Sequence, residues 1–493
     1  MNAPSVAVTM TLGGHPAVGS AAPVPVEDPA TGDVFAYAPA CTPQELDTAV
    51  AAAALAAPGW AASDEDERRA RLRACGAALA GCLDEVAGLL SREQGKPLRN
   101  AQAEVQLSAD WFGHTAELTL APEVLEDTDT SCIGLERVPH GVVAAIAPSN
   151  FPLILSVCKI APALLAGNTV VLKPSPQTPL STLRMGEALR DHLPPGVLNV
   201  VSGDHDLGAG LTSHPAIGMI SFTGSVATGR AIARGAAERF LPVVLELGGN
   251  DPAIVLPGAD VDALAPRLFQ AALANSGQFC AAVKRVYVHR DQTARLAELL
   301  ADLAGCAVVG AGADPASEFG PLVSREQLGR VAALVDDAVA RGARVLSGGK
   351  PLGGPGHFYP PTVVVDLPEG TELELEEQFG PVIPVIAYDD VDEAVGRANS
   401  TQYGLGASLW GDEDLADELA GRLDAGTVWI DTHGDLRHNV PFSGTGSSGR
   451  GAEYGYWGLL EYTRIKVRHR ARVAGRRPAG GASSAAHDRP GER

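Results

Sequence analysis

The feature that most constrains this fold is a series of short apolar segments separated by stretches long enough to be helices. The first two, VVAAIA at 142–147 and TVVLK at 169–173, carry apolar side chains at both odd and even positions. Strands that are apolar on both faces are typical of parallel sheets covered by helices on each side. The pattern recurs after residue 250, so the sequence predicts two α/β domains in series. The predicted strands span 142–147, 169–173, 197–201, 217–222, 253–256, 286–289, 382–388 and 405–410.

A helical block precedes these strands. The tetrapeptide TPQE at 42–45 has the pattern of a capping box with proline at the first helical position. This helix is predicted to end at Pro58-Gly59. Further helices are predicted from Ser63 to about Ser91, and over roughly 100–118.

Both ends of the chain are predicted to be disordered tails. Residues 1–22 are small, apolar and irregular, and residues 471–493 are rich in Gly, Ala, Pro, Ser and Arg. Segments of this composition bury too little apolar surface to offset the entropy of ordering. The N-terminal stretch also lacks the basic start and long apolar core of a signal peptide.

Charge and cysteine content narrow the partners and the compartment. The 493-residue chain carries a formal net charge of −21. An acidic chain repels phosphate backbones and anionic surfaces, so neither nucleic acid nor a membrane is expected as a partner. No apolar run approaches the length of a membrane span. The seven cysteines include no CxxC pair, so neither a metal site nor a disulfide framework is expected, and this fits a reducing cytoplasm.

A glycine turn follows one predicted strand. No GxGxxG follows any of them, but Gly224, Ser225 and Gly229 lie where the strand at 217–222 gives way to a helix. Small residues at such a turn let the backbone approach a pyrophosphate, and a helix N-terminus favours anions. On its own, a glycine turn of this kind is more often structural.

Five other segments are individually ordinary but unusual in combination. A lone cysteine is usually a small buried hydrophobe, and two glycines after a strand usually form a turn. The segments are, in chain order, PSNFPL at 148–153, KPSP at 173–176, ELGGND at 246–251, NSGQFC at 275–280 and EEQFGPV at 376–382.

In this order the segments resemble the aldehyde dehydrogenase superfamily, over roughly residues 25–468. The stretches LELGGNDPAIVLPGADVD, NSGQFCAAVKRVYVH, EEQFGPVIPV and AGTVWIDTHG are most similar to a broad, NAD-linked, non-acylating branch. That branch includes fungal ethanol-utilisation-type and bacterial biosynthetic or catabolic members. The resemblance implies an enzyme that oxidises an aldehyde to a carboxylic acid.

The resemblance also implies the catalytic residues. Cys280 matches the nucleophile, which forms a thiohemiacetal and, after hydride transfer, a thioester. The side-chain amide of Asn150 and the backbone N–H of Cys280 match the donors to the oxyanion. Glu246 matches the general base that activates water to hydrolyse the thioester.

Further matched positions imply a cofactor site for NAD, with NADP not excluded. Lys173 and Ser175 lie in the segment that holds the adenosine ribose, and Ser225 matches a pyrophosphate contact in the glycine turn. Glu377 matches the residue that holds the nicotinamide ribose, with Phe379 beside it.

Four positions depart from the usual family pattern. Ser149 replaces the tryptophan before the oxyanion asparagine, which would open the cofactor cleft slightly, so Ser149 is a further candidate cofactor contact. Pro176 replaces a glutamate that binds the adenosine ribose and repels a 2′-phosphate, which weakens the preference for NAD over NADP. Near the substrate mouth, PFSG at 441–444 replaces PFGG, and Asp431 replaces an asparagine.

The resemblance implies a Rossmann-like cofactor domain, an α/β catalytic domain and a small β extension for oligomerisation. Their expected ranges are 23–122 and 141–248, then 249–448, then 123–140 and 449–470. Because such extensions pair between subunits in the family, a homodimer or homotetramer is expected.

The aldehyde itself is not named by these motifs. By resemblance, the loop HGDLRHN at 433–439 lines the substrate entrance, where Arg437 and His438 are unexpected in an acidic chain. Arginine suits a carboxylate because its planar fork binds both oxygens. This predicts an anionic semialdehyde as substrate, against the simpler alternative that Arg437 only pairs with Asp435 or solvent.

Two other functions stay open at this point. In a CoA-acylating dehydrogenase a thiol cofactor would intercept the thioester, but Glu246 favours hydrolysis. A catalytically dead binding protein on the same fold is the other alternative, and the presence of Cys280, Glu246 and Asn150 argues against it.

Overall fold

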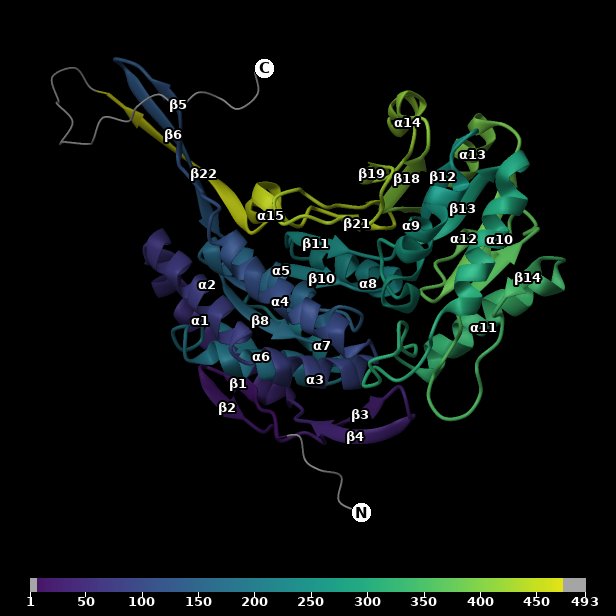
Figure 1. Cartoon of the computed structure of the whole chain (residues 1–493). Helices are drawn as coiled ribbons and strands as arrows, with labels where there is room; N and C mark the ends of the chain where they lie inside the picture. Colours follow the sequence, from purple (N-terminus) through teal and green to yellow (C-terminus); the bar gives the residue numbers. More distant parts are fainter. Residues whose placement is uncertain (1–6, 473–493) are drawn as a thin grey trace.

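Two large, mostly parallel sheets organise residues 7–472, the part of the chain that this computed structural model describes (Figure 1). The first sheet has the strand order β2-β1-β9-β8-β7-β10-β11-β21, and its five strands from β9 to β11 run parallel. The strands are β1 (Met10–Leu12), β2 (His15–Ala17), β7 (Val142–Ile146), β8 (Thr169–Lys173), β9 (Leu198–Val200), β10 (Ile217–Thr223), β11 (Val243–Glu246) and β21 (Gly449–Arg450).

The second sheet has the order β14-β15-β16-β13-β12-β18-β19 and is parallel except at the β14–β15 edge. Its strands are β12 (Asp251–Val255), β13 (Val283–His289), β14 (Arg344–Ser347), β15 (Thr362–Val365), β16 (Val382–Tyr388), β18 (Gly406–Trp410) and β19 (Thr427–Ile430). Two small pairs, β3 (Val24–Asp28) with β4 (Asp33–Ala38) and β17 (Tyr403–Gly404) with β20 (Thr445–Gly446), lie outside the large sheets.

The apolar pattern of the strands explains the two sheets. Along β12 and β13, Ile254 and Tyr287 belong to one buried cluster, whereas Val255 and Val286 belong to another. Successive side chains of a strand point to opposite faces, so both faces of this sheet are buried. The prediction of two α/β units with parallel strands is confirmed, and all eight predicted strands form.

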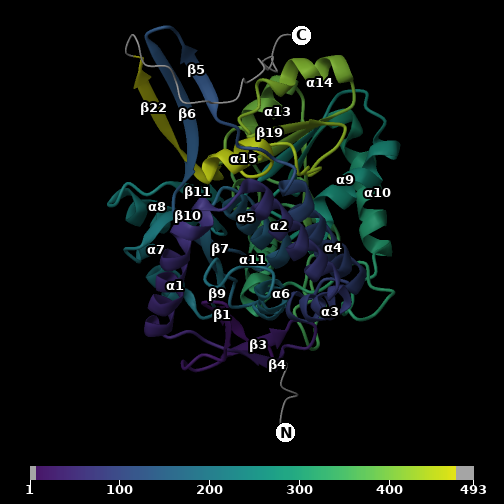
Figure 2. The same ribbon diagram turned by 90° about the vertical axis from the view of Figure 1, so that its left-hand side faces the viewer.

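Helices cover both faces of the first sheet. One group, α1 with α7 and α8, packs on one side, and α5 and α6 pack on the other beneath an outer layer of α2 to α4 (Figure 2). These helices are α1 (Pro43–Ala62), α2 (Glu65–Ala80), α3 (Leu83–Gln94), α4 (Leu98–Thr115), α5 (Pro152–Leu165), α6 (Leu180–Arg190), α7 (His205–Ser213) and α8 (Val226–Ala237).

The helices after residue 250 surround the second sheet, except the last, α15 (Gly455–Glu461), which packs against α5. Several begin at an aspartate or serine whose side chain accepts a hydrogen bond from the first turn, as Ser324 does for α11. They are α9 (Val261–Leu273), the short 3₁₀ turn Ala274–Gly277, α10 (Arg290–Cys306), α11 (Arg325–Ala340), α12 (Glu372–Leu375), α13 (Val391–Ala398), α14 (Glu413–Ala420) and α15 (Gly455–Glu461).

Two helix predictions are wrong: one helix ends later than predicted, and another is divided into two helices. The capping box at Thr42 is present, but α1 runs through Pro58 to Ala62. There Trp60 is buried and its indole N–H donates to the carbonyl of Leu164, so tertiary packing overrides the proline. The predicted helix at 63–91 is two helices, α2 and α3, which meet at 69°.

The predicted N-terminal tail is also wrong over residues 7–22, while residues 1–6 and 473–493 lie outside the described part. β1 pairs with β2 and, through Thr11, with Val200 of β9. Met10 is fully buried, and Thr9 donates two hydrogen bonds to Glu187. This strand pairs with a segment almost two hundred positions away, which local composition does not reveal.

A three-stranded arm projects from the body (Figure 1). It consists of β5 (Glu123–Asp127), β6 (Ser131–Pro139) and β22 (Thr463–Ala471), all antiparallel. The predicted C-terminal part of the extension began at residue 449, but β21 pairs with β11 of the first sheet, so only β22 belongs to the arm. The predicted tail likewise begins too early, because Ala471 pairs with Ser131.

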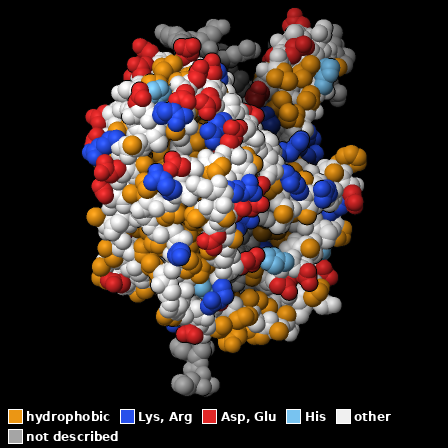
Figure 3. Space-filling model, turned by 90° about the vertical axis from the view of Figure 1, so that its right-hand side faces the viewer, with side chains coloured by type: hydrophobic (Ala, Val, Ile, Leu, Met, Phe, Trp, Pro, Cys, Tyr) orange, Lys and Arg blue, Asp and Glu red, His pale blue; other side chains and the backbone are white. Residues whose placement is uncertain are grey.

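The arm displays hydrophobic side chains on its surface (Figure 3). Its exposed large apolar residues are Val124, Leu125, Ile465 and Val467. Within the described residues no single helix is long and apolar enough to cross a membrane; α2 and α3 reach that length and composition only together, and both pack against α4.

Candidate active site

A cleft of about 1200 Å³ opens at the carboxyl ends of β7, β8 and β10, facing the second sheet. Ligands of open α/β sheets commonly bind at this edge of the strands. Most of the predicted cofactor and catalytic residues line this cleft; they are Ser149, Asn150, Lys173, Ser175, Gly224, Ser225, Cys280, Glu377 and Phe379. Two more lie directly behind the lining residue Leu247. Gly229 packs against the Leu247 side chain, and Glu246 precedes Leu247 in the chain.

The glycine turn forms one wall of the cleft at the start of α8. Ser225 caps this helix by accepting a hydrogen bond from the N–H of Thr228 at 3.3 Å. A Cβ at Gly229 would lie 2.5 Å from the side chain of Leu247, so this glycine permits close packing of α8 on the chain that follows β11. The helix N-terminus therefore faces the cleft, where it can bind an anionic group.

Lys173 ends β8 at the same edge. Burial lowers the pKa of its ammonium to about 8, against the opposing effect of Asp204. Its one recorded hydrogen bond is a long one, 3.3 Å to the carbonyl of Pro174. The ammonium therefore has donors left for hydroxyl groups of a ligand in the cleft.

Glu377 lies on the opposite wall, in the loop after α12. Burial raises the pKa of its carboxyl to about 7, and Lys284 opposes that rise. The N–H of Gly249 lies 3.4 Å from its Oε1. The neighbouring Phe379 has a positive φ of 47°, and Gln327 fixes this turn by donating to its carbonyl at 2.9 Å.

Cys280 sits in a loop between the 3₁₀ turn and β13. Three residues upstream adopt left-handed backbone angles, Asn275 with φ 53°, Ser276 with φ 57° and Gly277 with φ 73°. Burial raises the pKa of the Cys280 thiol, as do the carboxyl groups nearby, and Lys284 lowers it. The resting side chain is therefore a thiol that must be activated before it can attack.

Asn150 is fixed against this loop. Its side chain is 4 % exposed and donates to the carbonyl of Gln278 at 3.1 Å. Its own carbonyl accepts hydrogen bonds from Lys96 at 2.8 Å and from Asn275 at 3.1 Å. One amide hydrogen of Asn150 thus remains for a ligand next to Cys280.

Glu246 ends β11 and is 4 % exposed, yet neither carboxyl oxygen has a hydrogen-bond partner among the described residues. Burial is the main cause that raises its pKa well above the usual range, Glu453 adds to the rise, and Lys159 opposes it. A buried carboxyl without partners is the arrangement expected of a base that waits for a water or substrate proton.

Lys159 and Glu453 were not predicted from the sequence. They form a buried ion pair at 2.5 Å, and the Lys159 ammonium also donates to Thr223 at 2.6 Å. Lys159 was detectable, because it is the lone charged residue in α5, whose fourteen residues are all buried. Glu453 lies 294 positions away, and its role depends on tertiary structure alone.

The comparisons with known proteins agree with this geometry. The sequence model of the aldehyde dehydrogenase family matches residues 17–468. An aldehyde dehydrogenase of a Fusarium species is 37% identical over 89% of this chain and 94% of its own length. The glutarate-semialdehyde dehydrogenase of Pseudomonas aeruginosa is 36% identical over 90% of this chain and 93% of its own length.

The chain belongs to the aldehyde dehydrogenase family. Its structure agrees with an NAD⁺ complex of an aldehyde dehydrogenase from Bacillus cereus at a TM-score of 0.92, with 33% identity and 94% and 96% of the two chains covered. A 3,6-anhydro-L-galactose dehydrogenase bound to NADP gives a TM-score of 0.90, with 33% identity over 94% of this chain and all of that one. The predicted fold and the enzyme class, an NAD(P)-dependent aldehyde dehydrogenase, are confirmed.

The residues of this aldehyde dehydrogenase that were predicted at the substrate entrance, Arg437 and His438, do not line the cofactor cleft. Arg437 is 66% exposed on its side chain and binds one oxygen of Asp435 through Nε at 3.0 Å and Nη2 at 2.7 Å. His438 stacks on His114 of α4 with ring centroids 3.7 Å apart. Its ring also lies edge-on to Trp111 of the same helix, with centroids 6.3 Å apart. The structure thus brings Arg437 and Asp435 together, as the simpler alternative stated.

Opposite pH shifts are expected when the buried ion pair is broken from either side. In Glu453→Gln a charge that raises the pKa of Glu246 is lost and Lys159 remains, so the Glu246 pKa should fall and turnover should become half-maximal at lower pH. In Lys159→Met the unpaired Glu453 should move the same profile to higher pH.

The measurement is the pH dependence of steady-state turnover, at a temperature well below the melting temperature of each variant. Breaking a buried pair costs stability, on the order of 3–5 kcal/mol, so circular dichroism must first show folded protein. Shifts in the same direction for both variants would contradict an electrostatic effect on Glu246.

Proposed function

We propose that this enzyme oxidises an aldehyde to a carboxylic acid in two stages, with Cys280 as nucleophile, Asn150 as oxyanion donor and Glu246 as general base. The observation that carries the proposal is that Cys280 and Asn150 line one cleft, while the partnerless Glu246 carboxyl lies directly behind it and raises the pKa of the Cys280 thiol. No other cysteine among the described residues lines that cleft.

In the first stage the Cys280 thiol loses its proton to water in the cleft, the thiolate sulfur bonds to the carbonyl carbon, and the carbonyl π electrons move to oxygen. The Asn150 amide and the backbone N–H of Cys280 would donate to that oxygen as its charge develops. Lys173, the start of α8 and Glu377 would hold a nicotinamide dinucleotide in the cleft, and this cofactor would supply the acceptor for the hydride released when the carbonyl re-forms.

In the second stage the acyl group is held on Cys280 as a thioester. Glu246 takes a proton from water, the hydroxide oxygen bonds to the acyl carbon, and the Cys280 thiolate leaves. Because burial raises the pKa of Glu246, its carboxyl becomes a carboxylate only as the pH rises through this raised pKa, and the second stage should accelerate over the same range.

The cleft suits a dinucleotide at three points. The start of α8 at Ser225 would face the pyrophosphate, Lys173 would bind ribose hydroxyls at one end, and Glu377 would bind them at the other. We propose NAD as the cofactor and retain NADP, because Pro176 presents no carboxylate that would repel a 2′-phosphate.

Product analysis with and without coenzyme A tests this function. The expected product from a simple aldehyde and NAD⁺ is the free acid in both cases, at equal rates, since Glu246 directs water to the thioester. An acyl-CoA product formed faster than the acid would favour the CoA-acylating alternative. Absence of any oxidation across a panel of aldehydes with both dinucleotides would favour a binding protein on this fold.

For the substrate we propose a semialdehyde that carries a carboxylate a few atoms from the aldehyde. Two observations support this: one named relative is a glutarate-semialdehyde dehydrogenase, and Arg437 lies in the loop that precedes Phe442. Asp435 contacts the Nε and Nη2 atoms of Arg437, and no contact to its Nη1 is recorded within residues 7–472.

An Arg437→Ala variant is expected to raise KM for such a semialdehyde about 5- to 30-fold, as a charge-assisted hydrogen bond contributes roughly 1–2 kcal/mol when partly exposed. The KM for a neutral aldehyde of equal length should change less than about twofold. Arg422→Ala, which removes an exposed arginine paired with Asp392, is the matched control. Equal changes for both substrates would remove Arg437 from recognition.

We further propose that the arm joins subunits into a homodimer or homotetramer. Its exposed Val124, Leu125, Ile465 and Val467 form an apolar surface that is unusual for a monomer. Light scattering on the intact chain should then give the mass of two or four chains, and a stable monomer at micromolar concentration would contradict it. The reaction needs Cys280 as a free thiol, and all seven cysteines are free here, which suits the cytoplasm.

A further inference from the structure

A lysine lies fully buried behind the nucleophile, and the two-stage reaction does not use it. Lys284 is the second residue of β13, four positions after Cys280, and is 1% exposed. Its ammonium donates to the carbonyl of Gly277 at 2.7 Å and lies 5.4 Å from the centre of the Phe379 ring. No carboxylate of the described residues lies within 4.0 Å of it.

The hydrogen bond of Lys284 closes the nucleophile loop. It joins β13 to Gly277 across the seven residues that include Cys280. Gly277 has a φ of 73°, and a Cβ there would lie 2.2 Å from the carbonyl oxygen of Gly380, so its backbone is held tightly on the other side as well. The loop that carries the Cys280 sulfur and N–H is therefore fixed at its base by the ammonium.

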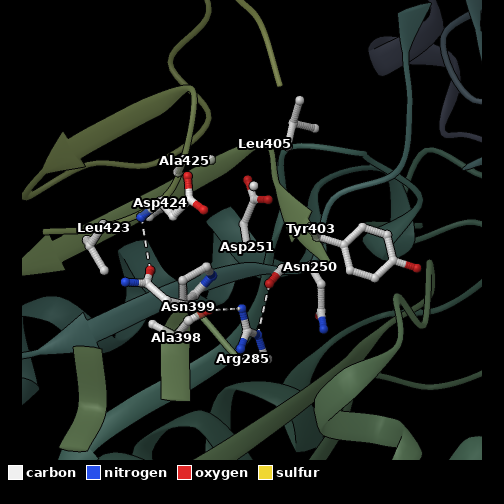
Figure 4. A pocket seen from close by; sticks show the side chains of 14 residues that line it. Asn250, Asp251, Arg285, Ala398, Asn399, Tyr403, Leu405, Leu423, Asp424 and Ala425 are labelled. Carbon is white, nitrogen blue, oxygen red and sulfur yellow. Dashed lines mark hydrogen bonds between the residues drawn. The ribbon is translucent and has the colours of Figure 1, made fainter. Parts of the chain in front are cut away.

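The adjacent Arg285 shows how different the environment of Lys284 is. The two side chains point to opposite sides of β13. The Arg285 guanidinium donates to the carbonyls of Asn250 and Ala398, both at 2.9 Å, in the small pocket of Figure 4. It also donates to the carbonyl of Arg397 at 3.1 Å. Arg285 is thus saturated with acceptors, whereas Lys284 has one recorded acceptor.

A buried cation costs several kcal/mol unless negative charge compensates it. Three acidic groups oppose the effect of burial on the pKa of the Lys284 ammonium: Glu377 before β16, Asp251 at the start of β12, and the Cys280 thiol. Asp251 in turn faces His433 at 3.5 Å, and Glu377 faces Arg330. Each of the three groups favours the charged form of Lys284, and burial opposes it.

We propose that Lys284 is a positioning residue for aldehyde oxidation: its ammonium fixes the nucleophile loop through Gly277, and its positive charge supports the Cys280 thiolate on one side and the Glu377 carboxylate that would bind the nicotinamide ribose on the other. This inference rests on the proposed roles of Cys280 and Glu377. The charge of Lys284 acts on both groups at once. If the Glu377 carboxylate binds a ribose of the dinucleotide, the Lys284 ammonium still compensates the negative charge of the Cys280 thiolate.

The test is the rate at which iodoacetamide alkylates Cys280 across pH 6–10, followed on the Cys280 peptide by mass spectrometry in the full-length protein. No aldehyde or turnover is involved, so the result stands apart from the proposed reaction, whose own failure would appear as activity surviving in Cys280→Ser. Lys284→Met removes charge and hydrogen bond, Lys284→Gln keeps a donor without charge, and Lys284→Arg keeps both.

In Lys284→Met and Lys284→Gln the alkylation profile is expected to move up by roughly one pH unit or more, which is about a tenfold slower reaction at pH 8. Binding of NAD⁺, measured by fluorescence, should weaken in both. The Lys284→Arg profile should coincide with that of the wild type. A wild-type profile in Lys284→Gln would show that only the hydrogen bond matters and would overturn the electrostatic part.

The arginine variant keeps the test decisive if the neutral variants do not fold. Arginine stays charged throughout this pH range. If Lys284 is charged in the wild type, the two profiles agree. A wild-type profile displaced to higher pH than that of Lys284→Arg would mean that Lys284 is neutral, and the proposal would be lost.

Discussion

Replacing Cys280 with serine is expected to abolish aldehyde oxidation, lowering kcat/KM on the order of 10⁴-fold or more. A serine hydroxyl in the same position has a far higher pKa than a thiol, and burial here disfavours even the thiolate. The Lys173 and Ser225 walls of the cleft are untouched, so binding of NAD⁺ should be within about twofold of the wild type. Absorbance of the reduced cofactor and fluorescence titration measure the two quantities.

Cys306→Ser is the matched control, because Cys306 is exposed at the end of α10, away from the cleft. It should retain full activity. If Cys280→Ser keeps more than about a hundredth of the wild-type rate with unchanged KM, Cys280 is not the nucleophile and the proposed chemistry fails.

Replacing Glu246 with glutamine is expected to separate the two stages. Glutamine is close in shape and lies in a site without hydrogen-bond partners, so the first stage should persist and give a burst of about one reduced cofactor per active site. Hydrolysis needs the carboxylate, and steady-state turnover should fall roughly 10²- to 10⁴-fold. Stopped-flow absorbance resolves the burst from the slow phase.

Glu418→Gln, an exposed carboxyl in α14, is the control and should behave as the wild type. If the burst disappears together with turnover in Glu246→Gln, Glu246 acts mainly to activate the Cys280 thiol. Lys159 and Glu453 are expected to act on turnover through the pKa of Glu246. Once Glu246 is replaced by glutamine, further changes at either residue should therefore not alter the reduced turnover.

The parallel strands could be predicted because burial on both faces of a sheet requires apolar residues at successive positions, and this pattern is visible in the local sequence. Alternate residues of β12 and β13 enter different cores, Ile254 and Tyr287 one and Val255 and Val286 the other, so apolar side chains stand at both odd and even positions of these runs. The N-terminal strand β1 shows no such pattern. It has three residues, and what orders it is pairing with β9 and burial of Met10, both of which are non-local.

The candidate site likewise contains residues that the local sequence predicts and others that depend on tertiary contacts. Segments such as NSGQFC and ELGGND are contiguous and specific, so Cys280 and Glu246 could be predicted by resemblance. The groups that set the charge around them could not, because Lys159 meets Glu453 across 294 positions, and Lys284 acts through Gly277 and Glu377. Lys159 gives a local sign as the one charged residue of the apolar α5, whereas Lys284 stands next to Arg285 in β13 and gives none.

The substrate-side interpretation is the least constrained by the fold. The sequence places Arg437 next to His438, but the structure shows that the first pairs with Asp435 and the second stacks on His114. An arginine on an exposed loop contacts whatever carboxylate is nearest, so its pairing in the absence of substrate does not determine its role. Only the comparison of charged and neutral aldehydes does.

The covalent intermediate is the most direct measurement of the central claim. Glu246→Gln enzyme is mixed with an aldehyde and NAD⁺, quenched in acid within the burst, and analysed by peptide mass spectrometry. The account predicts that the peptide containing Cys280 gains the mass of the acyl group less one hydrogen, and that no other cysteine peptide changes. An acyl group on another residue, or a burst of reduced cofactor with no acylated peptide, would contradict it.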